Sequence, residues 1–290
     1  MAKIGLLDID GHNYPNLALM KLSAYHKMKG DRVEFATMFE HYDIIYKSKV
    51  FTWTPDNDYA YNTDATMVGG TGYGLNDLWL CGDVDSMRPD YSLYNCQHAY
   101  GFLTRGCIRK CSWCIVPKKE GNIRPYADID DFIGGYKSAV LMDNNVLAHD
   151  HGLGQIEKII RRGIRIDFNQ GLDARLITDN VSDLLKRVKW IDGIRLACDS
   201  MASIEPVRKA IESLRWANYH GRISVYVLVK DVGDALERIR FLKGMKVDPF
   251  AQAYRDFDEN NEPTIEQKNL CRWVDHKATF KSIKWDEYQA

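Results

Sequence analysis

The fold to expect is indicated by the stretch Tyr100-Gly-Phe-Leu-Thr-Arg-Gly-Cys-Ile-Arg-Lys-Cys-Ser-Trp-Cys114. It begins as an apolar, strand-like run that ends at Gly106, and three cysteines follow in one short loop. They are Cys107, Cys111 and Cys114, spaced C-x3-C-x2-C. Thiols packed this densely bind a metal or a cluster far more often than they fill a core. Because a four-iron cluster normally takes four thiolates, a loop with three leaves one iron open to an exchangeable ligand.

Zinc is the alternative use of these cysteines. A zinc site needs a fourth ligand, for which Cys81, Cys96 and His98 are candidates, but zinc sites usually use paired C-x2-C hooks and this chain has one. A disulfide framework is disfavoured by the odd number of cysteines, 7, and by an N-terminus without a charged-then-apolar signal segment. The cluster is therefore the preferred interpretation, and zinc stays open beside it.

Composition sets bounds on the class of protein. A chain of 290 residues with 45% apolar content can build one large or two modest globular domains. The net charge of −1 gives no global basic excess that would indicate nucleic acid, and there is no acidic tail. The longest apolar runs, such as residues 223–229, are far shorter than the ~20 residues that span a bilayer. We therefore expect a soluble, cytoplasmic protein with no membrane partner.

The first part of the chain predicts an open α/β sheet. Residues 3–9 and 32–37 have the pattern of buried strands, and the amphipathic stretch 15–30 between them has that of a helix closed by a glycine. Such a strand–helix–strand run makes a right-handed βαβ unit. Residues 43–46 continue the sheet, and 66–74 predict a strand that runs into a glycine turn. The expected layout is Rossmann-like.

From residue 100 onward, strand and helix patterns alternate regularly. The predicted strands are 100–105, 139–144, 164–169, 194–198, 223–229 and 249–254. The predicted helices are 128–137, 152–162, 178–188, 204–217 and 234–245. This alternation predicts a parallel βα array, either open or closed. Six strands are too few for a full eight-stranded barrel.

Polar residues follow several of these strands. Since ligands of parallel βα barrels bind at the carboxyl ends of the strands, these positions are the functional candidates. Asp143 can accept a hydrogen bond from an ammonium group, and the guanidinium of Arg175 suits bidentate recognition of a carboxylate. The structural alternatives are an Asx turn at Asp143 and an ion pair of Arg175 with Asp173 or Asp179.

The C-terminal tail, residues 260–290, predicts a helix over 264–280 with Leu270, Trp273 and Val274 on one face, packed against the barrel. Basic and aromatic residues interleave in it, which is the composition of a nucleic-acid face; an amphipathic helix with a solvated lysine face explains the same pattern. Basic residues also flank the cysteine loop and favour an anionic substrate or an electron donor: Arg109, Lys110, Lys118, Lys119 and Arg124.

With Trp113 just before the last cysteine, the loop resembles the C-x3-C-x-aromatic-C signature of the radical S-adenosylmethionine (radical SAM) superfamily. The resemblance implies a [4Fe-4S] cluster on Cys107, Cys111 and Cys114, whose open iron binds S-adenosylmethionine. Reductive cleavage would then give a 5′-deoxyadenosyl radical that abstracts hydrogen from a substrate. It also implies a partial (β/α)6 TIM barrel over residues 93–259, with the cysteine loop after its first strand, and a reductant such as flavodoxin or ferredoxin.

The resemblance extends to positions at the strand ends. Asp143-Asn-Asn145 stands where the family has a "GGE"-type motif, although its glycines are missing, and Cys198-Asp-Ser200 resembles the family's "ES". Arg175 stands where related proteins carry an arginine that reaches the cofactor. The implied cofactor-binding residues are Trp113, Asp143, Asn144, Asn145, Asn169, Arg175, Asp199 and Ser200. Substrate-facing candidates are Gln170, Asp173, Tyr254 and Arg255.

The order of the parts is similar to that of short radical SAM proteins of phages and gut bacteria with a cobalamin-type domain, here residues 1–92. The cobalamin signature D-x-H-x-x-G is partly matched by Asp10-Gly-His12-Asn-Tyr-Pro15, and Ser48-Lys-Val50 and Gly69-Gly70 echo later elements. Proline replaces the final glycine, and the spacings are compressed. These departures weigh against cobalamin binding through His12.

The leading hypothesis is thus a radical SAM enzyme acting on a substrate that the sequence does not name. The alternative from another class is a zinc-stabilised nucleic-acid-binding protein without radical chemistry. A third hypothesis combines the two, as a radical enzyme that modifies nucleic acid or a nucleoside. No second cysteine cluster is evident in the sequence, so sulfur insertion from an auxiliary cluster is not expected.

Overall fold

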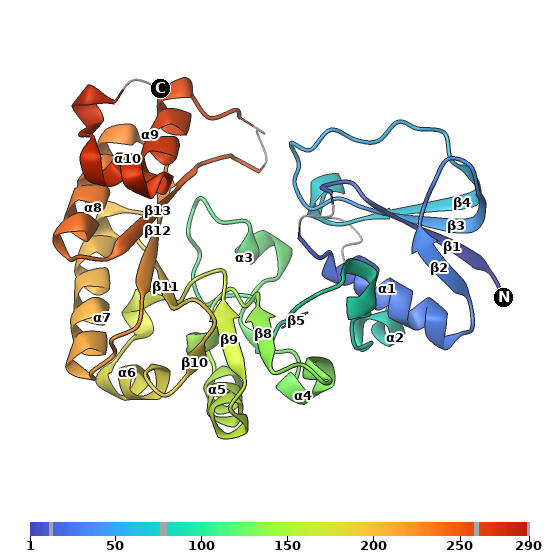
Figure 1. Cartoon of the computed structure of the whole chain (residues 1–290), viewed down its shortest axis with the longest axis horizontal. Helices are drawn as coiled ribbons and strands as arrows, with labels where there is room; N and C mark the ends of the chain where they lie inside the picture. The colour runs from blue at the N-terminus through green and yellow to red at the C-terminus, as the bar shows by residue number, and fades with distance from the viewer. Residues whose placement is uncertain (12–13, 76–79, 258–260, 289–290) are drawn as a thin grey trace. The chain divides into compact units, whose positions relative to one another are not determined.

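The computed structural model describes residues 1–11, 14–75, 80–257 and 261–288. The chain has mixed α/β architecture with parallel sheets (Figure 1). It divides into two compact units. The first comprises Met1–Gly101 and Asp130–Tyr136, and the second comprises Phe102–Ile129 and Lys137–Ala290.

The first unit contains a parallel sheet with the strand order β2-β1-β3-β4. Its elements are β1 (Lys3–Asp8), α1 (Leu17–Met28), β2 (Arg32–Phe35), β3 (His41–Ser48), β4 (Asn62–Gly69), α2 (Gly82–Asp85) and β5 (Ala99–Gly101). Leu19 and Leu22 of α1 pack with Ile4 and Leu6 of β1, which buries one face of the sheet. The predicted strand–helix–strand opening is confirmed. The fourth strand begins four residues earlier than expected, because its exposed edge carries polar residues that hide the strand pattern.

The connection from β2 to β3 explains why this sheet differs from a doubly wound one. Residues 36–40 cross back over β1 without a helix, and a Cβ on Gly5 would meet Ala36 at 3.0 Å and Tyr42 at 3.1 Å. Glycine at position 5 therefore makes room for Ala36 of the crossing segment and for the side chain of Tyr42 in β3. Within the described residues, α1 is the helix that connects strands of this sheet. A full Rossmann-like arrangement stays a prediction.

The second unit alternates short strands with helices. In chain order the elements are β6 (Thr104–Arg105), α3 (Val116–Lys119), β7 (Arg124–Pro125), α4 (Ile129–Ile133, which continues into the first unit), β8 (Ser138–Leu141), α5 (Asp150–Arg162), β9 (Arg165–Phe168), α6 (Asp179–Leu185), β10 (Lys189–Trp190), β11 (Ile194–Ala197), α7 (Ile204–Trp216), β12 (Ile223–Val229), α8 (Val232–Gly244), β13 (Asp248–Ala253), α9 (Ile265–Asp275) and α10 (Lys277–Ser282).

Two groups of parallel strands carry this unit. Strands β10, β9 and β8 are neighbours in one, and β11, β12 and β13 in the other. A parallel bridge between Leu172 and Leu196 joins the two groups. Helices α5, α7 and α8 lie along the outer side of the strands (Figure 1), and buried Ile156, Ile211 and Ile239 anchor them. The predicted βα alternation is confirmed, whereas closure into a partial TIM barrel stays a prediction.

Helix α9 packs on β13, the last strand of its sheet. Its Asp275 side chain accepts a hydrogen bond from the N–H of Ala251 over 2.9 Å. Leu270, Trp273 and Val274 are buried, as the tail pattern predicts. The helix ends at Asp275 rather than continuing to Phe280, since His276 leaves the helical conformation and caps α10. In the described part of the chain, no helix is both long and apolar enough to cross a membrane.

Candidate functional site

The three cysteines lie on a loop whose two ends meet in a narrow neck. The loop leaves β6, which pairs antiparallel with β7, and the N–H of Cys107 donates to the carbonyl of Gly121 over 3.2 Å. Gly106, just before the first cysteine, has a φ of +82°, and a Cβ there would stand 2.2 Å from the carbonyl oxygen of Asn122. Only glycine fits this position, because both the backbone conformation and the space exclude a side chain.

Glu120 ties the neck together from inside. Its side chain is buried, and its Oε2 accepts hydrogen bonds from the N–H of Gly106 and from Nδ2 of Asn144, each over 2.9 Å. Its Oε1 pairs with Nη2 of Arg105, also at 2.9 Å. One carboxylate thus joins the start of the loop, the end of the loop and the residues after β8. Figure 1 shows α3 and the loop beside the ends of β8 and β9.

Asp143 fixes the chain just before the loop. The residue is 1% exposed, and its Oδ1 accepts hydrogen bonds from the N–H of Thr104 at 2.6 Å and from the hydroxyl of Thr104 at 2.7 Å. The N–H of Leu103 donates to the same carboxylate over 3.1 Å. These bonds explain why the predicted strand 100–105 is interrupted between β5 and β6. Burial raises the pKa of Asp143 to about 6, although the hydrogen bonds from Thr104 and Leu103 oppose the shift.

The cysteine side chains are free thiols and half-buried. The N–H of Cys114 donates to the carbonyl of Cys111 over 3.1 Å, which turns the second half of the loop back on itself. Burial raises the pKa of the Cys114 thiol, and negative charge on Cys111, Cys107 and Asp199 raises it further. Cys107 and Cys111 therefore lie within electrostatic range of Cys114.

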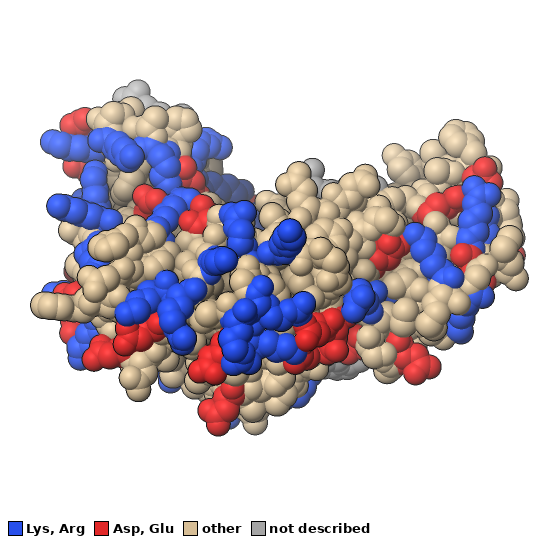
Figure 2. All heavy atoms as spheres, turned by 60° about the horizontal axis from the view of Figure 1, so that its bottom comes forward, with Lys and Arg blue, Asp and Glu red and all other residues tan. Residues whose placement is uncertain are grey.

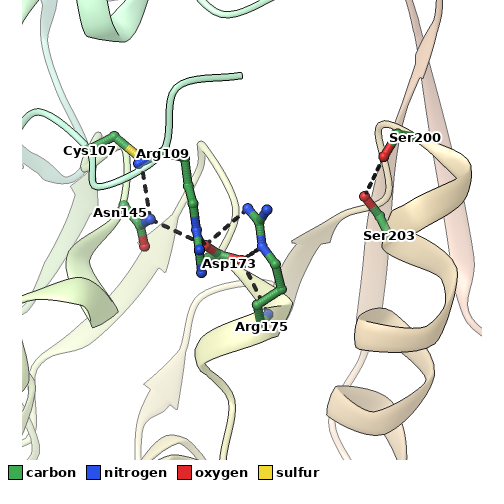
Figure 3. Close-up of polar contacts among 7 residues, drawn as sticks. All are labelled: Cys107, Arg109, Asn145, Asp173, Arg175, Ser200 and Ser203. Carbon is green, nitrogen blue, oxygen red and sulfur yellow. Dashed lines mark hydrogen bonds and ion pairs between the residues drawn. The ribbon is translucent and has the colours of Figure 1, made fainter. Parts of the chain in front are cut away.

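A polar network surrounds Cys107 (Figure 3). Its Sγ accepts hydrogen bonds from Nδ2 of Asn145 and from the N–H of Arg109, each over 3.3 Å. The same Nδ2 of Asn145 donates to Oδ2 of Asp173 over 3.3 Å. Arg109 and Arg175 hold Asp173 from two sides, with Nε–Oδ distances of 2.9 Å and 2.6 Å. The structure thus brings together five residues that the sequence places on three separate loops, after β6, β8 and β9.

Asp173 is the centre of that network. Burial on its own would raise the pKa of Asp173, but hydrogen bonds from Arg175 and Arg109 outweigh burial and lower it. The carboxylate therefore stays ionised. Arg175 uses Nε and Nη2 in this pair, and its side chain is 45% exposed. The ion pair with Asp173, which the sequence left as the alternative role of Arg175, is present.

Asp199 and Ser200 follow β11 on the neighbouring sheet. The N–H of Leu228 donates to Oδ1 of Asp199 over 3.2 Å, and burial raises the pKa of this carboxyl. Ser200 contacts the hydroxyl of Ser203 at 3.1 Å (Figure 3). Arg238, which is 1% exposed, donates to the carbonyls of Cys198 and Leu228 over 2.6 Å and 3.0 Å. This arginine thus links the residue after β11 to β12, next to Asp199 in the chain.

The remaining candidate residues are Asn169, Gln170, Trp113, Tyr254 and Arg255. The backbone carbonyl of Asn169 accepts a hydrogen bond from Tyr226, and its side chain accepts one from Gln170. Trp113 is half-buried within the loop. Farther along the chain, Tyr254 donates to Asp256, and Arg255 forms an ion pair with Glu262.

The cobalamin-like positions lie in the first unit. Asp10 accepts a hydrogen bond from the hydroxyl of Thr54 at 2.6 Å and one from the N–H of Phe51 at 3.3 Å, so its carboxylate holds the turn after β3. Lys49 and Gly69 are joined by a backbone hydrogen bond of 3.1 Å. His12, the expected cobalamin ligand, lies outside the described residues.

The zinc candidates Cys81 and Cys96 also belong to the first unit, and Cys96 contacts the sulfur of Met20 at 3.9 Å. Among the described residues, no group of three or more His, Cys, Asp and Glu side chains is arranged to hold one metal ion. The ligands of a cubane cluster each bind a different iron, so they need not converge on one point. Three half-buried thiols on one loop, one of them receiving two N–H donors, fit the ligand set of such a cluster.

Comparison with known proteins gives a limited result. No family model and no curated protein matches the chain. Among solved structures, SuiB of Streptococcus suis bound to precursor peptide SuiA has 13% identity and a TM-score of 0.45, over 63% of this chain and 46% of that one. SuiB bound to S-adenosylmethionine has 13% identity and a TM-score of 0.45, over 63% of this chain and 48% of that one. The matched part spans less than half of SuiB.

Three features of the site were not predicted from the sequence. Glu120 and Arg238 carry no motif, and their partners lie up to 40 residues away in the chain. The contact of Asn145 with a sulfur was also missed, since the sequence suggested only a ligand-facing role. The sequence does contain one signal for Glu120. Gly106 and Gly121 stand at the two ends of the cysteine loop, and Glu120 directly precedes the second glycine.

Proposed function

We propose that this protein is a radical SAM enzyme in which Cys107, Cys111 and Cys114 hold a [4Fe-4S] cluster. The observation that carries the proposal is the cysteine loop itself, with three free, half-buried thiols on a neck fastened by Glu120 and Gly106. A three-thiolate loop leaves one iron for an exchangeable ligand. When bound, the cluster supplies an electron that cleaves S-adenosylmethionine into methionine and the 5′-deoxyadenosyl radical, which abstracts hydrogen from the substrate.

Arg175 binds the carboxylate of S-adenosylmethionine in this proposal. Its guanidinium is partly exposed, and Asp173 already orients it through Nε and Nη2, so Nη1 can be presented to a ligand. Negative charge on Cys107 and Cys111 contributes to raising the pKa of Arg175, after the larger effect of Asp173. Arg175 therefore lies within electrostatic range of the thiols, as a residue that binds the ligand of the open iron must.

The roles at the strand ends differ from those suggested by the sequence. In this proposal Asp143 does not bind the ligand's ammonium group, because its carboxylate is buried and accepts hydrogen bonds from Leu103 and Thr104. Asp199 takes that role instead, or binds the ribose, since its influence on the pKa of Cys114 indicates proximity to the loop. Asp143, Asn144 and Glu120 then hold the loop in place.

The test is anaerobic reconstitution with iron and sulfide, followed by incubation with S-adenosylmethionine and dithionite and detection of 5′-deoxyadenosine by mass spectrometry. Wild-type protein should be brown and should form 5′-deoxyadenosine. Cys111→Ala should abolish both properties. Cys271→Ala is the matched control, because Cys271 lies in α9 and outside the cysteine loop. A colourless wild-type protein with stoichiometric zinc would overturn the proposal.

The nucleic-acid-binding alternative gains no comparable support. The basic residues of the tail are partly engaged within the protein: Lys268 pairs with Glu262 at 3.0 Å, and Lys277 donates to the carbonyl of Pro249 over 2.5 Å. Figure 2 shows acidic side chains interspersed with the basic ones on the visible face. On that face the neighbouring acidic side chains partly offset the positive charge that would attract a phosphate backbone.

A further inference from the structure

Two N–H groups point at a single sulfur of the loop, that of Cys107. One is the backbone N–H of Arg109, a neighbour within the loop, at 3.3 Å. The other is Nδ2 of Asn145, which reaches the same sulfur over 3.3 Å from the segment after β8 (Figure 3). Asn145 is 2% exposed, so water does not compete for this contact.

The orientation of the Asn145 side-chain amide leaves one buried polar atom without a hydrogen bond to any residue that the structure describes. Nδ2 faces the sulfur and the carboxylate of Asp173, while Oδ1 is buried and has no hydrogen-bond partner among the described residues. Turning the amide over would place Oδ1 against two electron-rich acceptors, which is worse. A buried acceptor without a partner destabilises a protein, and such an exception calls for an explanation. The donor contact to the sulfur supplies one.

The neighbours of Asn145 keep this arrangement in place. Asp173 stays ionised because Arg175 and Arg109 bind it, and an ionised carboxylate attracts the amide's N–H rather than its oxygen. Arg109 therefore acts twice, through its side chain on Asp173 and through its backbone on Cys107. The sulfur of Cys107 thus receives two N–H donors, from Asn145 and Arg109, that stabilise negative charge on it.

We propose that Asn145 is a positioning residue that raises the reduction potential of the cluster through its N–H···S bond to Cys107. Reduction adds one electron to the cluster and increases the negative charge on its sulfurs, without transfer of a proton. A hydrogen bond to a ligating sulfur stabilises that added charge, and such bonds are among the determinants of cluster potentials. This inference rests on the proposed function, since it requires the cluster on Cys107.

The experiment is a redox titration of the reconstituted protein without S-adenosylmethionine, followed by electron paramagnetic resonance. Asn145→Leu keeps the approximate shape but removes the donor, so its midpoint potential should be more negative than that of wild type. Asn145→Gln keeps an amide and should recover part of the shift. Asn144→Leu is the matched control: its amide donates to Glu120 and not to a sulfur, so it should lower cluster loading but leave the potential of the loaded fraction unchanged.

The outcomes separate the two proposals. A wild-type protein that binds no cluster contradicts the proposed function. Clusters that form in wild type and in Asn145→Leu with the same midpoint potential contradict only the role of Asn145. If Asn145→Leu does not fold, as judged by circular dichroism, Asn145→Ala provides the same comparison without added bulk, and an unchanged potential there is equally decisive.

Discussion

Asp143, Asn144 and Asn145 are three consecutive polar residues after one strand, and each has a different task. Asp143 holds the backbone before the cysteine loop, Asn144 binds Glu120 at the neck, and Asn145 donates to the sulfur of Cys107. All three are turned toward the protein rather than toward open solvent. The polar triplet therefore supports the cysteine loop, and Arg175 and Asp199 are the groups that we propose to bind the ligand.

The buried carboxyl of Asp143 should make stability depend on pH. Because burial raises its pKa from 3.8 to about 6, the unfolded chain loses this proton at lower pH than the folded one. The associated stability is present below pH 3.8 and is lost as the pH rises through about 6. The shift corresponds to about 3 kcal/mol. Chemical denaturation of the cluster-free protein between about pH 4.5 and about pH 7 should show about 2 kcal/mol of this fall in wild type but not in Asp143→Asn, and parallel curves would refute it.

Arg175 should determine the affinity for S-adenosylmethionine. Arg175→Lys keeps the positive charge but loses the planar pair of donors, so the dissociation constant should rise about tenfold, or about 1.4 kcal/mol. Equilibrium dialysis against the reconstituted protein measures it, with iron content as the check on cluster loading. Arg161→Lys, an exposed residue of α5, is the control. Equal affinities in wild type and Arg175→Lys would show that the guanidinium binds something else.

For single residues, the sequence was informative where the chemistry is local. The three cysteines lie within eight positions, so their spacing alone indicated a cluster loop. Glu120, Arg238 and the sulfur contact of Asn145 depend on partners that only the fold brings near. A buried glutamate and an exposed one look the same in a sequence, which is why Glu120 was missed.

The cysteine loop carries the proposed cluster. Substitutions at two glycines test whether its neck is tightly packed. Gly106 and Gly121 both have positive φ, but a Cβ on Gly106 meets the Asn122 carbonyl at 2.2 Å while one on Gly121 meets nothing within 4 Å. Gly121→Ala should cost about 1 kcal/mol. Gly106→Ala should cost about 3 kcal/mol and reduce iron retention. Thermal unfolding and iron analysis measure both, and equal effects would contradict the tight neck.

Glu120 offers a second test of the same neck. Glu120→Ala leaves the N–H of Gly106 and the side chain of Arg105 without their buried acceptor, so it should destabilise the protein by about 3 kcal/mol. The cluster should also be lost faster on dilution. Glu157→Ala, which removes an exposed partner of Arg161 at 3.9 Å, should change stability by less than about 0.5 kcal/mol. Similar unfolding curves for Glu120→Ala and Glu157→Ala would show that Glu120 does not stabilise the neck of the loop.

At the element scale, helices and strands were largely predictable because their apolar periodicity is strong. The predicted β12, residues 223–229, has the bounds of the observed strand. Two departures have clear causes. The strand predicted at residues 100–105 is interrupted where Asp143 takes the N–H groups of Leu103 and Thr104. The tail helix breaks at His276, whose ring accepts a hydrogen bond from the N–H of Thr279.

The whole molecule carries nearly balanced charge, with a net value of −1. Several basic side chains are paired, as Arg222 is with Asp192 at 3.0 Å and with Asp248 at 2.9 Å. Binding of a fluorescent single-stranded RNA should therefore be weak and should change little with salt, since few phosphates would be neutralised. Fluorescence anisotropy at several salt concentrations measures this. A steep loss of affinity with salt would instead favour a nucleic-acid substrate.

At this scale the sequence predicted parallel α/β architecture, which depends on the alternation of elements along the chain. It did not reveal that residues 130–136 belong with the first unit while the residues on either side belong with the second. The place of residues 130–136 in the first unit depends on packing. One such contact is the hydrogen bond of 2.8 Å from the Tyr91 hydroxyl to the carbonyl of Phe132. Contacts of this kind leave no periodic signal.

The most direct test of the central claim is Mössbauer spectroscopy of the ⁵⁷Fe-reconstituted protein before and after addition of S-adenosylmethionine. Three cysteine ligands predict a four-iron cluster in which one iron differs from the other three and changes its signal when S-adenosylmethionine binds. Cys271→Ala should give the same spectra, and Cys107→Ala should give no intact cluster. A protein that binds zinc instead of iron, or a cluster whose spectrum is unaffected by S-adenosylmethionine, would contradict the account.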